Sequence, residues 1–279
     1  MKHQDLVRLV RAALREDRAW DDVTSSTTIP ASARAKGVIL AKSPLVLAGT
    51  AAAAAAFRVM DAKARVVWLV GEGARIEPGT TVATVFGRAR ALLSAERVAV
   101  NFLMRLSGIA TLTREFVEAL PKGTNAKILD TRKTTPLLRA LEKDAVATGG
   151  GANHRATLAE AILIKDNHVA LAGSVLEAVT RARRMARRGL WVQCEVTSLD
   201  EARVAMGAGA DALLLDNMSP AAMRKVVREF GGRVPLEASG GVTLATIRAI
   251  AKTGVDRISI GALTHSAPAA NLSLELAPA

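Results

Sequence analysis

Residues 130–155 read DTRKTTPLLRALEKDAVATGGGANHR, and the interpretation of the whole chain starts from this stretch. The apolar pair Ile128-Leu129 precedes it, which predicts a short strand that ends at Asp130. Pro136 suits the first turn of a following helix, because its missing N–H has no partner there anyway. Three glycines at 149–151 stop that helix and let the backbone approach a ligand closely. The basic side chains of the stretch are Arg132, Lys133, Arg139, Lys143, His154 and Arg155.

These basic side chains form pairs on both flanks of one predicted helix, where they repel each other unless an anion holds them. Arginine offers a planar fork for carboxylate or phosphate, and lysine a compact point charge. Either pair alone is most simply solvated surface. The two pairs with the glycines between them predict an anion site.

The composition also indicates anionic partners. The chain has 279 residues, half of them hydrophobic, which is enough for a large core and two domains. Its formal net charge is +12 and its pI about 10.6. Aromatic residues make up only 3%, with no tyrosine, so few side chains could stack on nucleic-acid bases. The basic run at 181–188 has helical spacing and is most simply a solvated helix face, so small anionic substrates explain the charge at least as well.

Cys194 is the only cysteine, so no intrachain disulfide can form, and its strand context predicts a buried, inert thiol. The first residues mix charges and lack the apolar core of a secretory signal. No stretch approaches the 18 or so apolar residues of a membrane span. The sequence therefore predicts a soluble cytoplasmic protein without membrane attachment.

The first part of the chain reads as α+β, with strands that are adjacent in sequence and antiparallel. A long helix follows, with Ser94 as its N-cap and a break near Gly108 before it resumes to Leu120. Residues 20–24 read as a loop. The predicted earlier elements are helices at 4–16 and 50–60 and strands at 35–41, 46–48, 66–70 and 81–86.

The remainder alternates short apolar strands with helices, which predicts βαβ units and a parallel sheet. The strands are predicted at 126–129, 161–164, 191–196, 212–215, 234–238 and 257–260, and the helices at 174–188, 199–208, 219–230 and 243–252, with Ser174, Ser198 and Ser219 as caps. A barrel and a doubly wound sheet both fit this alternation. Each strand ends in a polar residue or glycine, and only a barrel brings all these ends to one mouth. We therefore expect a shortened, incomplete barrel of six or seven strands.

Two groups at these strand ends suggest a chemistry. Glu195 and Asp216 end consecutive strands and suit Mg²⁺ shared with a phosphorylated substrate, or sugar hydroxyls; the alternative is salt bridges to Lys165 and Arg132. Ser239-Gly240-Gly241 before helix 243–252, with Gly261 on the last strand, predicts a phosphate-binding loop, although glycine at a strand end is commonly only a turn.

The four histidines and one cysteine show no zinc pattern, and no nucleophile triad is evident. A two-substrate transfer that involves a phosphorylated sugar fits these features better than hydrolysis.

An ordered set of motifs extends the interpretation across residues 16–266. The motifs are EDRAWDDVTS, ERVAVNFLMRLSGIAT, DTRKTTP, GGGANHR, ILIKDNHV, CEVTSLDEA, LLLDNMSP, LEASGGV and GVDRISIGALTHS. Together they resemble the quinolinate phosphoribosyltransferase family, the carboxylating nicotinate-nucleotide pyrophosphorylases. The resemblance implies transfer of phosphoribosyl from phosphoribosyl pyrophosphate to quinolinate with decarboxylation, a step of de novo NAD biosynthesis.

The resemblance also implies the type II phosphoribosyltransferase fold. An N-terminal α/β sandwich domain (1–111, with the tail 267–279 packing back on it) would precede an open, shortened α/β barrel (112–266). A homodimer with shared active sites, or a higher assembly of it, is implied, with Mg²⁺ as cofactor.

By motif, Arg132, Lys133, His154, Arg155 and Lys165 would bind quinolinate, and Arg97 would reach in from the partner subunit. Glu195 and Asp216 would contact the ribose and Mg²⁺-pyrophosphate, binding the metal directly or indirectly, and Ser239, Gly240 and Gly261 would hold the 5′-phosphate. The catalytic assignments are Lys133, Lys165, Glu195 and Asp216. The chain departs from the family pattern at Trp20, Leu137 and Thr197, and at Leu137 the family usually has glycine.

Two alternatives stay open at this point. One is a paralogue of the same fold that acts on another anionic substrate, as in the molybdenum-transport-associated proteins; the intact stretch around Lys165 favours quinolinate. The other, from a different class, is a basic protein that binds nucleic acid through residues 181–188.

Overall fold

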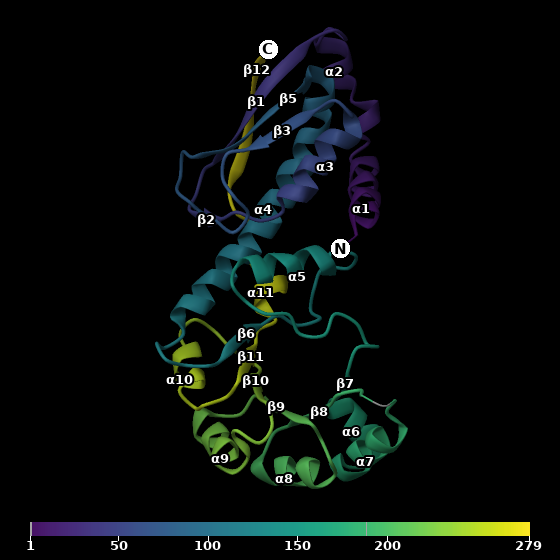
Figure 1. The fold of residues 1–279 in the computed structure, drawn as a ribbon. Coiled ribbons are helices and arrows are strands. Elements are labelled where there is room, and N and C mark those ends of the chain that lie inside the picture. The colour runs from purple at the N-terminus through teal and green to yellow at the C-terminus, as the bar shows by residue number, and fades with distance from the viewer. Residues whose placement is uncertain (1, 188) are drawn as a thin grey trace. The chain divides into compact units, whose positions relative to one another are not determined.

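The computed structural model of the protein describes residues 2–187 and 189–279, and its backbone divides into two compact units. The first unit comprises residues 2–112, 140–149 and 266–279, and the second comprises residues 113–139, 150–187 and 189–265. The sequence analysis had assigned residues 140–149 to the barrel, whereas here they group with the first unit. Figure 1 labels the elements of both.

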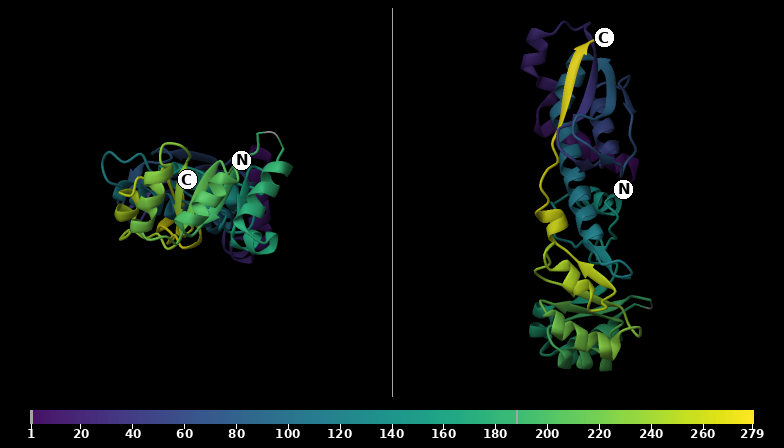
Figure 2. Two further views of the ribbon diagram at one scale, coloured as in Figure 1. Left: turned by 90° about the horizontal axis from the view of Figure 1, so that it is seen from below. Right: turned by 90° about the vertical axis from the view of Figure 1, so that its left-hand side faces the viewer.

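The first unit is built on a four-stranded antiparallel sheet with the strand order β12-β1-β5-β3. Its strands are β1 (Arg34–Ala41), β3 (Arg65–Trp68), β5 (Thr81–Arg88) and β12 (Leu272–Pro278). A separate pair is formed by β2 (Leu45–Val46) and β4 (Arg75–Ile76), of which β4 had no counterpart in the sequence analysis. Residues of β1 alternate between buried and exposed, as expected for a sheet with one covered face. The edge strand β12 runs beside β1 (Figure 2, right).

The helices of the first unit are α1 (His3–Glu16), α2 (Val23–Thr28), α3 (Thr50–Met60), α4 (Ala89–Ala119), which continues into the second unit, and α5 (Arg139–Thr148), after a short 3₁₀ turn at Ala19–Asp21. The run of alanines in α3 is buried, which allows close packing. The predicted loop at 20–24 is wrong, because Asp22 caps α2 by accepting the Ser25 N–H at 2.9 Å. The Pro136 prediction is also wrong, since α5 begins only at Arg139.

Helix α4 differs from the prediction in where it begins and in having no break at Gly108. It begins at Ala89, five residues before the predicted cap Ser94, and runs through Gly108 without a break. Ser94 instead donates to the Arg90 carbonyl within the helix. Gly108 serves packing: a Cβ there would lie 2.0 Å from the Pro268 carbonyl oxygen.

The second unit contains a six-stranded, all-parallel sheet with the order β6-β11-β10-β9-β8-β7. Its strands are β6 (Lys127–Leu129), β7 (Ile162–Ile164), β8 (Val192–Val196), β9 (Ala212–Asp216), β10 (Leu236–Ser239) and β11 (Arg257–Ser259). Strands β6 and β7 are the two edges, so the sheet does not close on itself. This is the open, shortened barrel expected from the strand ends.

The register of this sheet decides which side chains face its interior. Glu195 pairs with Leu214, and Leu214 pairs with Glu237, so these three residues share one level and one face. One level further along, Asp216 pairs with Ser239. Intervening residues such as Leu213 and Leu236 are fully buried on the opposite face, and helices α7, α8 and α9 pack on these strands (Figure 1).

The helices of the second unit are α6 (Asp166–Ala172), α7 (Val175–Met185), α8 (Leu199–Gly207), α9 (Pro220–Phe230), α10 (Ile247–Ala251) and α11 (Ala262–His265). Ser174, Ser198 and Ser219 cap α7, α8 and α9 as predicted, each accepting a backbone N–H at 3.1–3.2 Å. The predicted end of α7 at 188 lies outside the described residues. Among the residues described, no helix combines the length and the apolar character that a membrane crossing needs.

Candidate active site

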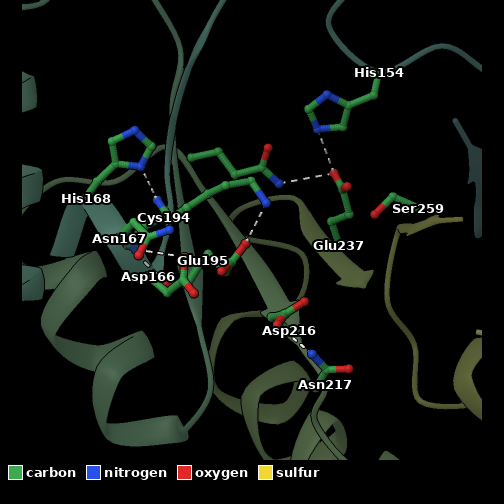
Figure 3. Close-up of polar contacts among 12 residues, drawn as sticks. His154, Asp166, Asn167, His168, Cys194, Glu195, Asp216, Asn217, Glu237 and Ser259 are labelled. Atoms are coloured by element: carbon green, nitrogen blue, oxygen red, sulfur yellow. Dashed lines mark hydrogen bonds and ion pairs between the residues drawn. The ribbon is translucent and has the colours of Figure 1, made fainter. Parts of the chain in front are cut away.

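A cavity of about 790 Å³ lies at the carboxyl ends of the parallel strands, and all its lining residues belong to the second unit. Ten of the eleven predicted site residues line it, namely Arg132, Lys133, His154, Arg155, Lys165, Glu195, Asp216, Ser239, Gly240 and Gly261. The structure therefore brings cations, carboxylates and the glycine loop to one mouth, although they are scattered over more than a hundred residues of sequence. Figure 3 shows the polar contacts in this region.

Arg97 is the predicted site residue that does not line the cavity. It lies exposed on α4 of the first unit. Its neighbour Glu96 is half-buried, and this burial raises the pKa of the Glu96 carboxyl, with the charge of Arg97 acting in the opposite direction.

Arg132 and Arg155 form a like-charged pair at the cavity. Burial lowers the pKa of the Arg155 guanidinium, and the nearby charge of Arg132 lowers that pKa further, against the opposite effect of Glu160. The Arg132 Nε is buried and has no hydrogen-bond partner among the described residues. A buried guanidinium donor without an acceptor, beside a second guanidinium, is unfavourable until an anion binds.

Two hydrogen bonds of His154 fix the backbone next to Arg155. The Asp130 Oδ1 accepts the His154 N–H at 2.8 Å, and the His154 Nδ1 accepts the Arg155 N–H at 2.8 Å. Because Nδ1 is an acceptor here, the ring carries its proton on Nε2. That nitrogen lies 3.5 Å from the Glu237 Oε2. His154 therefore sits in the predicted pocket, but with both ring nitrogens directed at the protein.

Glu195 and Asp216 stand on adjacent strands, as the sequence analysis expected. The Glu195 Oε2 lies 3.1 Å from the Lys165 Nζ, so in the free protein Glu195 forms the salt bridge to Lys165 that the alternative interpretation expected. The Lys165 side chain is 47% exposed and can exchange partners readily. Asp216 accepts a 2.7 Å hydrogen bond from the side chain of Asn217, whose left-handed backbone (φ 52°) turns it back toward that carboxylate.

The glycine loop after β10 has a close-packed geometry. Gly240 is left-handed (φ 90°), and a Cβ there would lie 2.1 Å from the Asn217 Oδ1, so only glycine fits. A Cβ on Gly261 would meet the Lys133 side chain at 3.0 Å. The predicted helix 243–252 begins only at Ile247 and is five residues long. Its N-terminus therefore lies four residues further along the chain than predicted, and its help to a phosphate stays a prediction.

Several lining residues were missed by the sequence analysis, notably His265 and Glu237. His265 was treated as one of four scattered histidines, but its ring lies close enough to Gly261 that a Cβ added there would come within 3.1 Å of the His265 Nε2. Glu237 carried a usable signal. It is a lone acid inside the apolar run VPLEA, at an interior position of a strand.

Cys194 is fully buried on β8, as predicted. Burial, with smaller effects from Glu201 and Glu195, raises the pKa of its thiol to about 12, so it is not a nucleophile at neutral pH. Among residues 2–187 and 189–279, no group of three or more His, Cys, Asp or Glu side chains could hold a metal ion. Two carboxylates that meet a metal carried by a phosphorylated ligand remain compatible with that finding.

Comparison with known proteins agrees with this geometry. Models of the quinolinate phosphoribosyl transferase N-terminal and C-terminal domains match residues 22–107 and 109–275. The chain belongs to the quinolinate phosphoribosyltransferase family.

Relatives of this family member align along nearly their whole lengths. The probable nicotinate-nucleotide pyrophosphorylase [carboxylating] of Bacillus subtilis is 41% identical over 99% of this chain and 95% of its own length. The nicotinate-nucleotide pyrophosphorylase [carboxylating] of Mycobacterium leprae is 42% identical over 96% of this chain and 95% of its own. The solved structure of the nicotinate-nucleotide pyrophosphorylase from Francisella tularensis superposes with a TM-score of 0.93 at 37% identity, over 99% of this chain and 98% of that one. The type II phosphoribosyltransferase fold implied by the resemblance is thus confirmed.

Proposed function

We propose that this quinolinate phosphoribosyltransferase family member transfers the phosphoribosyl group of phosphoribosyl pyrophosphate to quinolinate and releases pyrophosphate and CO₂, to give nicotinate mononucleotide. The observation that carries the proposal is the Arg132–Arg155 pair, with its unsatisfied buried Nε, in the same cavity as the glycine loop. A ligand with two adjacent carboxylates would supply the missing acceptors. A 5′-phosphate would occupy the loop at Ser239, Gly240 and Gly261.

The proposed reaction follows from the placement of these groups. The ring nitrogen of quinolinate attacks C1 of the ribose, the C1–O bond breaks, and its electron pair leaves with pyrophosphate. Glu195 and Asp216 face the positive charge that develops on the ribose, which stabilises that state. In the resulting pyridinium the C2–carboxylate bond breaks, CO₂ leaves, and the electron pair stays on C2 until a proton adds there. Lys133, Lys165 and Arg97 are the candidates to hold the carboxylate that is lost.

Magnesium belongs to this proposal as the companion of pyrophosphate. Glu195 and Asp216 are the carboxylates of this chain that would face it, directly or through water, which fits a metal that takes one or two protein carboxylates and its other ligands from phosphates. When bound, Mg²⁺ neutralises the leaving pyrophosphate.

A single assay tests the activity. Purified protein with Mg²⁺, phosphoribosyl pyrophosphate and quinolinate should form nicotinate mononucleotide, with one CO₂ and one pyrophosphate per turnover. Nicotinate should be a poor substrate, because one set of cations would stay unpaired. Equal rates with nicotinate, or no product from quinolinate, would contradict the proposal. Equal rates with nicotinate, or product from another anion alone, would favour the paralogue that acts on a different substrate.

We further propose a homodimer in which Arg97 completes the partner's site. Arg97 is exposed on α4 of the first unit, whereas the residues that line the cavity belong to the second. Arg97→Ala and Arg132→Ala should each be inactive, and mixing them should restore part of the activity, because one site in a mixed dimer keeps both arginines. Absence of rescue after confirmed subunit exchange would exclude shared sites.

The nucleic-acid alternative has its own test. DNA binding that depends on salt and survives Arg132→Ala and Arg155→Ala would favour it. The proposed enzyme should instead lose its small anionic ligands in those variants.

A further inference from the structure

Glu237 is a buried carboxylate that the proposed reaction does not use. It lies on β10 two residues before Ser239, with its side chain on the inner face of the barrel, and it is 1% exposed. Interior positions of α/β barrels are usually filled by valine, isoleucine or leucine. Burial of an ionised carboxylate costs several kcal/mol unless hydrogen bonds offset it, and an apolar residue of similar size is often no less stable. The charge at this position therefore calls for an explanation other than stability.

The contacts of Glu237 point toward the mouth of the barrel. Its Oε2 accepts a 3.1 Å hydrogen bond from the Nε2 of Gln193 on β8. The same oxygen lies 3.5 Å from the His154 Nε2, a contact that Figure 3 shows. Burial alone would raise the pKa of Glu237, but the contacts with His154 and Gln193 outweigh it and lower that pKa below its ordinary value. The side chain is thus a carboxylate at neutral pH. Its Oε1 has no hydrogen-bond partner among the described residues.

His154 connects this carboxylate to the anion pocket. With its Nδ1 accepting the Arg155 N–H, the ring proton is on Nε2 and is directed at Glu237. The His154 ring therefore connects the Glu237 carboxylate on β10 with the backbone N–H of Arg155. Glu237 is therefore placed to fix the ring orientation in which Nδ1 accepts the Arg155 N–H.

We propose that Glu237 is a positioning residue of the quinolinate pocket: it holds the ring of His154, and through that ring the segment that carries Arg155, while Gln193 holds Glu237 itself. The inference rests on the proposed function for the identity of the ligand. Glu237 acts through His154 and is not a catalytic residue.

The contact itself is tested without substrate, by proton NMR of the free protein. The Nε2–H of His154, assigned by its loss in His154→Ala, should give a low-field resonance in slow exchange with water. Glu237→Gln should move this resonance upfield or broaden it, because a neutral acceptor replaces a charged one. A His154 resonance unchanged by Glu237→Gln would overturn the inference.

The consequence for binding is tested by calorimetry with quinolinate. Glu237→Gln should weaken quinolinate binding roughly tenfold, the effect of losing one charge-assisted contact, and Glu237→Leu should weaken it at least as much without loss of folding stability. The affinity for phosphoribosyl pyrophosphate should change less than twofold. Because Glu237 acts through His154, adding Glu237→Gln to His154→Ala should cause almost no further loss. Additive losses, or equal losses for both ligands, would contradict a positioning role.

Asp61→Asn provides a matched control. Asp61 is also a buried carboxylate with a lowered pKa, but it lies in the first unit and does not line the cavity. Its replacement should reduce stability and leave quinolinate affinity unchanged, and a loss of affinity there would mean that general destabilisation explains the Glu237 result. The two proposals fail separately: absence of product from the wild-type protein overturns the function, whereas an unshifted His154 resonance overturns the positioning inference.

Discussion

The two sheets of this protein differ in where they place polar and charged side chains. In the first unit, buried side chains of β1 alternate with exposed or half-buried ones, and among the described residues the buried side-chain atom without a partner is the neutral hydroxyl oxygen of Ser273 on β12. In the second unit, Glu195 and Glu237 point into the barrel, and the buried side-chain atoms found without a partner in the described part of the chain belong to charged groups, Arg132 and Glu237. The second unit thus holds a buried guanidinium donor, the Arg132 Nε, that an anionic ligand could satisfy. Natural proteins commonly lose stability at such sites in exchange for function.

The largest expected effect comes from removing a charge of the second unit. Arg155→Ala should lower kcat/KM for quinolinate by roughly 1,000-fold, about 4 kcal/mol, because a carboxylate would then be bound without its partner. The free energy of unfolding of the unligated protein should fall by less than about 1 kcal/mol, because the repulsion by Arg132 disappears with the side chain. Steady-state kinetics and urea denaturation measure both values.

Arg183→Ala is the matched control, an arginine on α7 paired with Asp211 away from the cavity, and it should leave kcat/KM unchanged. A large loss of stability in Arg155→Ala with little loss of activity would reverse the contrast between the units.

The next effect should appear in the first unit and in stability alone. Gly108→Ala places a Cβ 2.0 Å from the Pro268 carbonyl oxygen, and backbone on both sides prevents relief. We expect a loss of about 3 kcal/mol or more in the free energy of unfolding, measured with urea. Gly207→Ala in α8 meets no atom within 4 Å and should be neutral or slightly stabilising. Equal stability of the two variants would show that the 266–279 segment does not pack as described.

Asp61 gives the first unit a pH dependence. Burial alone would raise the pKa of Asp61, but the N–H groups of Arg88 and Lys63 lower it below the ordinary 3.8. Since the pKa is lowered on folding, the stabilisation is present at pH values above 3.8 and is lost as pH falls through the folded-state value. Asp61→Asn should be about 1 kcal/mol less stable than wild type at pH 7. The difference should shrink in acid, and a difference that grows in acid would contradict this sign.

The smallest effect concerns backbone strain next to the site. Leu137 has a left-handed backbone (φ 66°) and is 90% exposed, where the family usually has glycine. Leu137→Gly should raise the free energy of unfolding by roughly 0.5–1 kcal/mol, the relief of strain less the added freedom of the unfolded chain. Leu171→Gly, equally exposed but within α6, should be destabilising. A destabilised Leu137→Gly would mean that the leucine side chain contributes contacts that outweigh the strain.

The sequence predicted the architecture of the second unit because its polar residues recur at one place in each repeat. Asp130, Glu195, Asp216 and Ser239 all follow short apolar runs, and only parallel strands bring such ends together. Element boundaries were predicted less well where local signals competed with packing. Ser94 has the chemistry of a cap but lies inside α4, and Gly108 has the chemistry of a helix break but is required by the contact with Pro268.

Within the candidate site, the residues found from the sequence were those that belong to motifs. Glu237 was missed because its partners Gln193 and His154 are distant in sequence, and nothing local shows that they meet. The engagement of both His154 nitrogens could not be predicted either, because it depends on the backbone conformation at Arg155. The roles assigned to the individual side chains stay predictions for the assays above.

The pairing of β12 with β1 has a consequence for how the protein is made. Lys42 and Glu275, which form an ion pair at 2.8 Å, are 233 residues apart in the chain. During synthesis, the second unit can leave the ribosome and fold before β12 is made. The sheet that contains β1, although translated first, is therefore completed last. Contacts over such separations form slowly, and until then an open strand edge is exposed to other nascent chains.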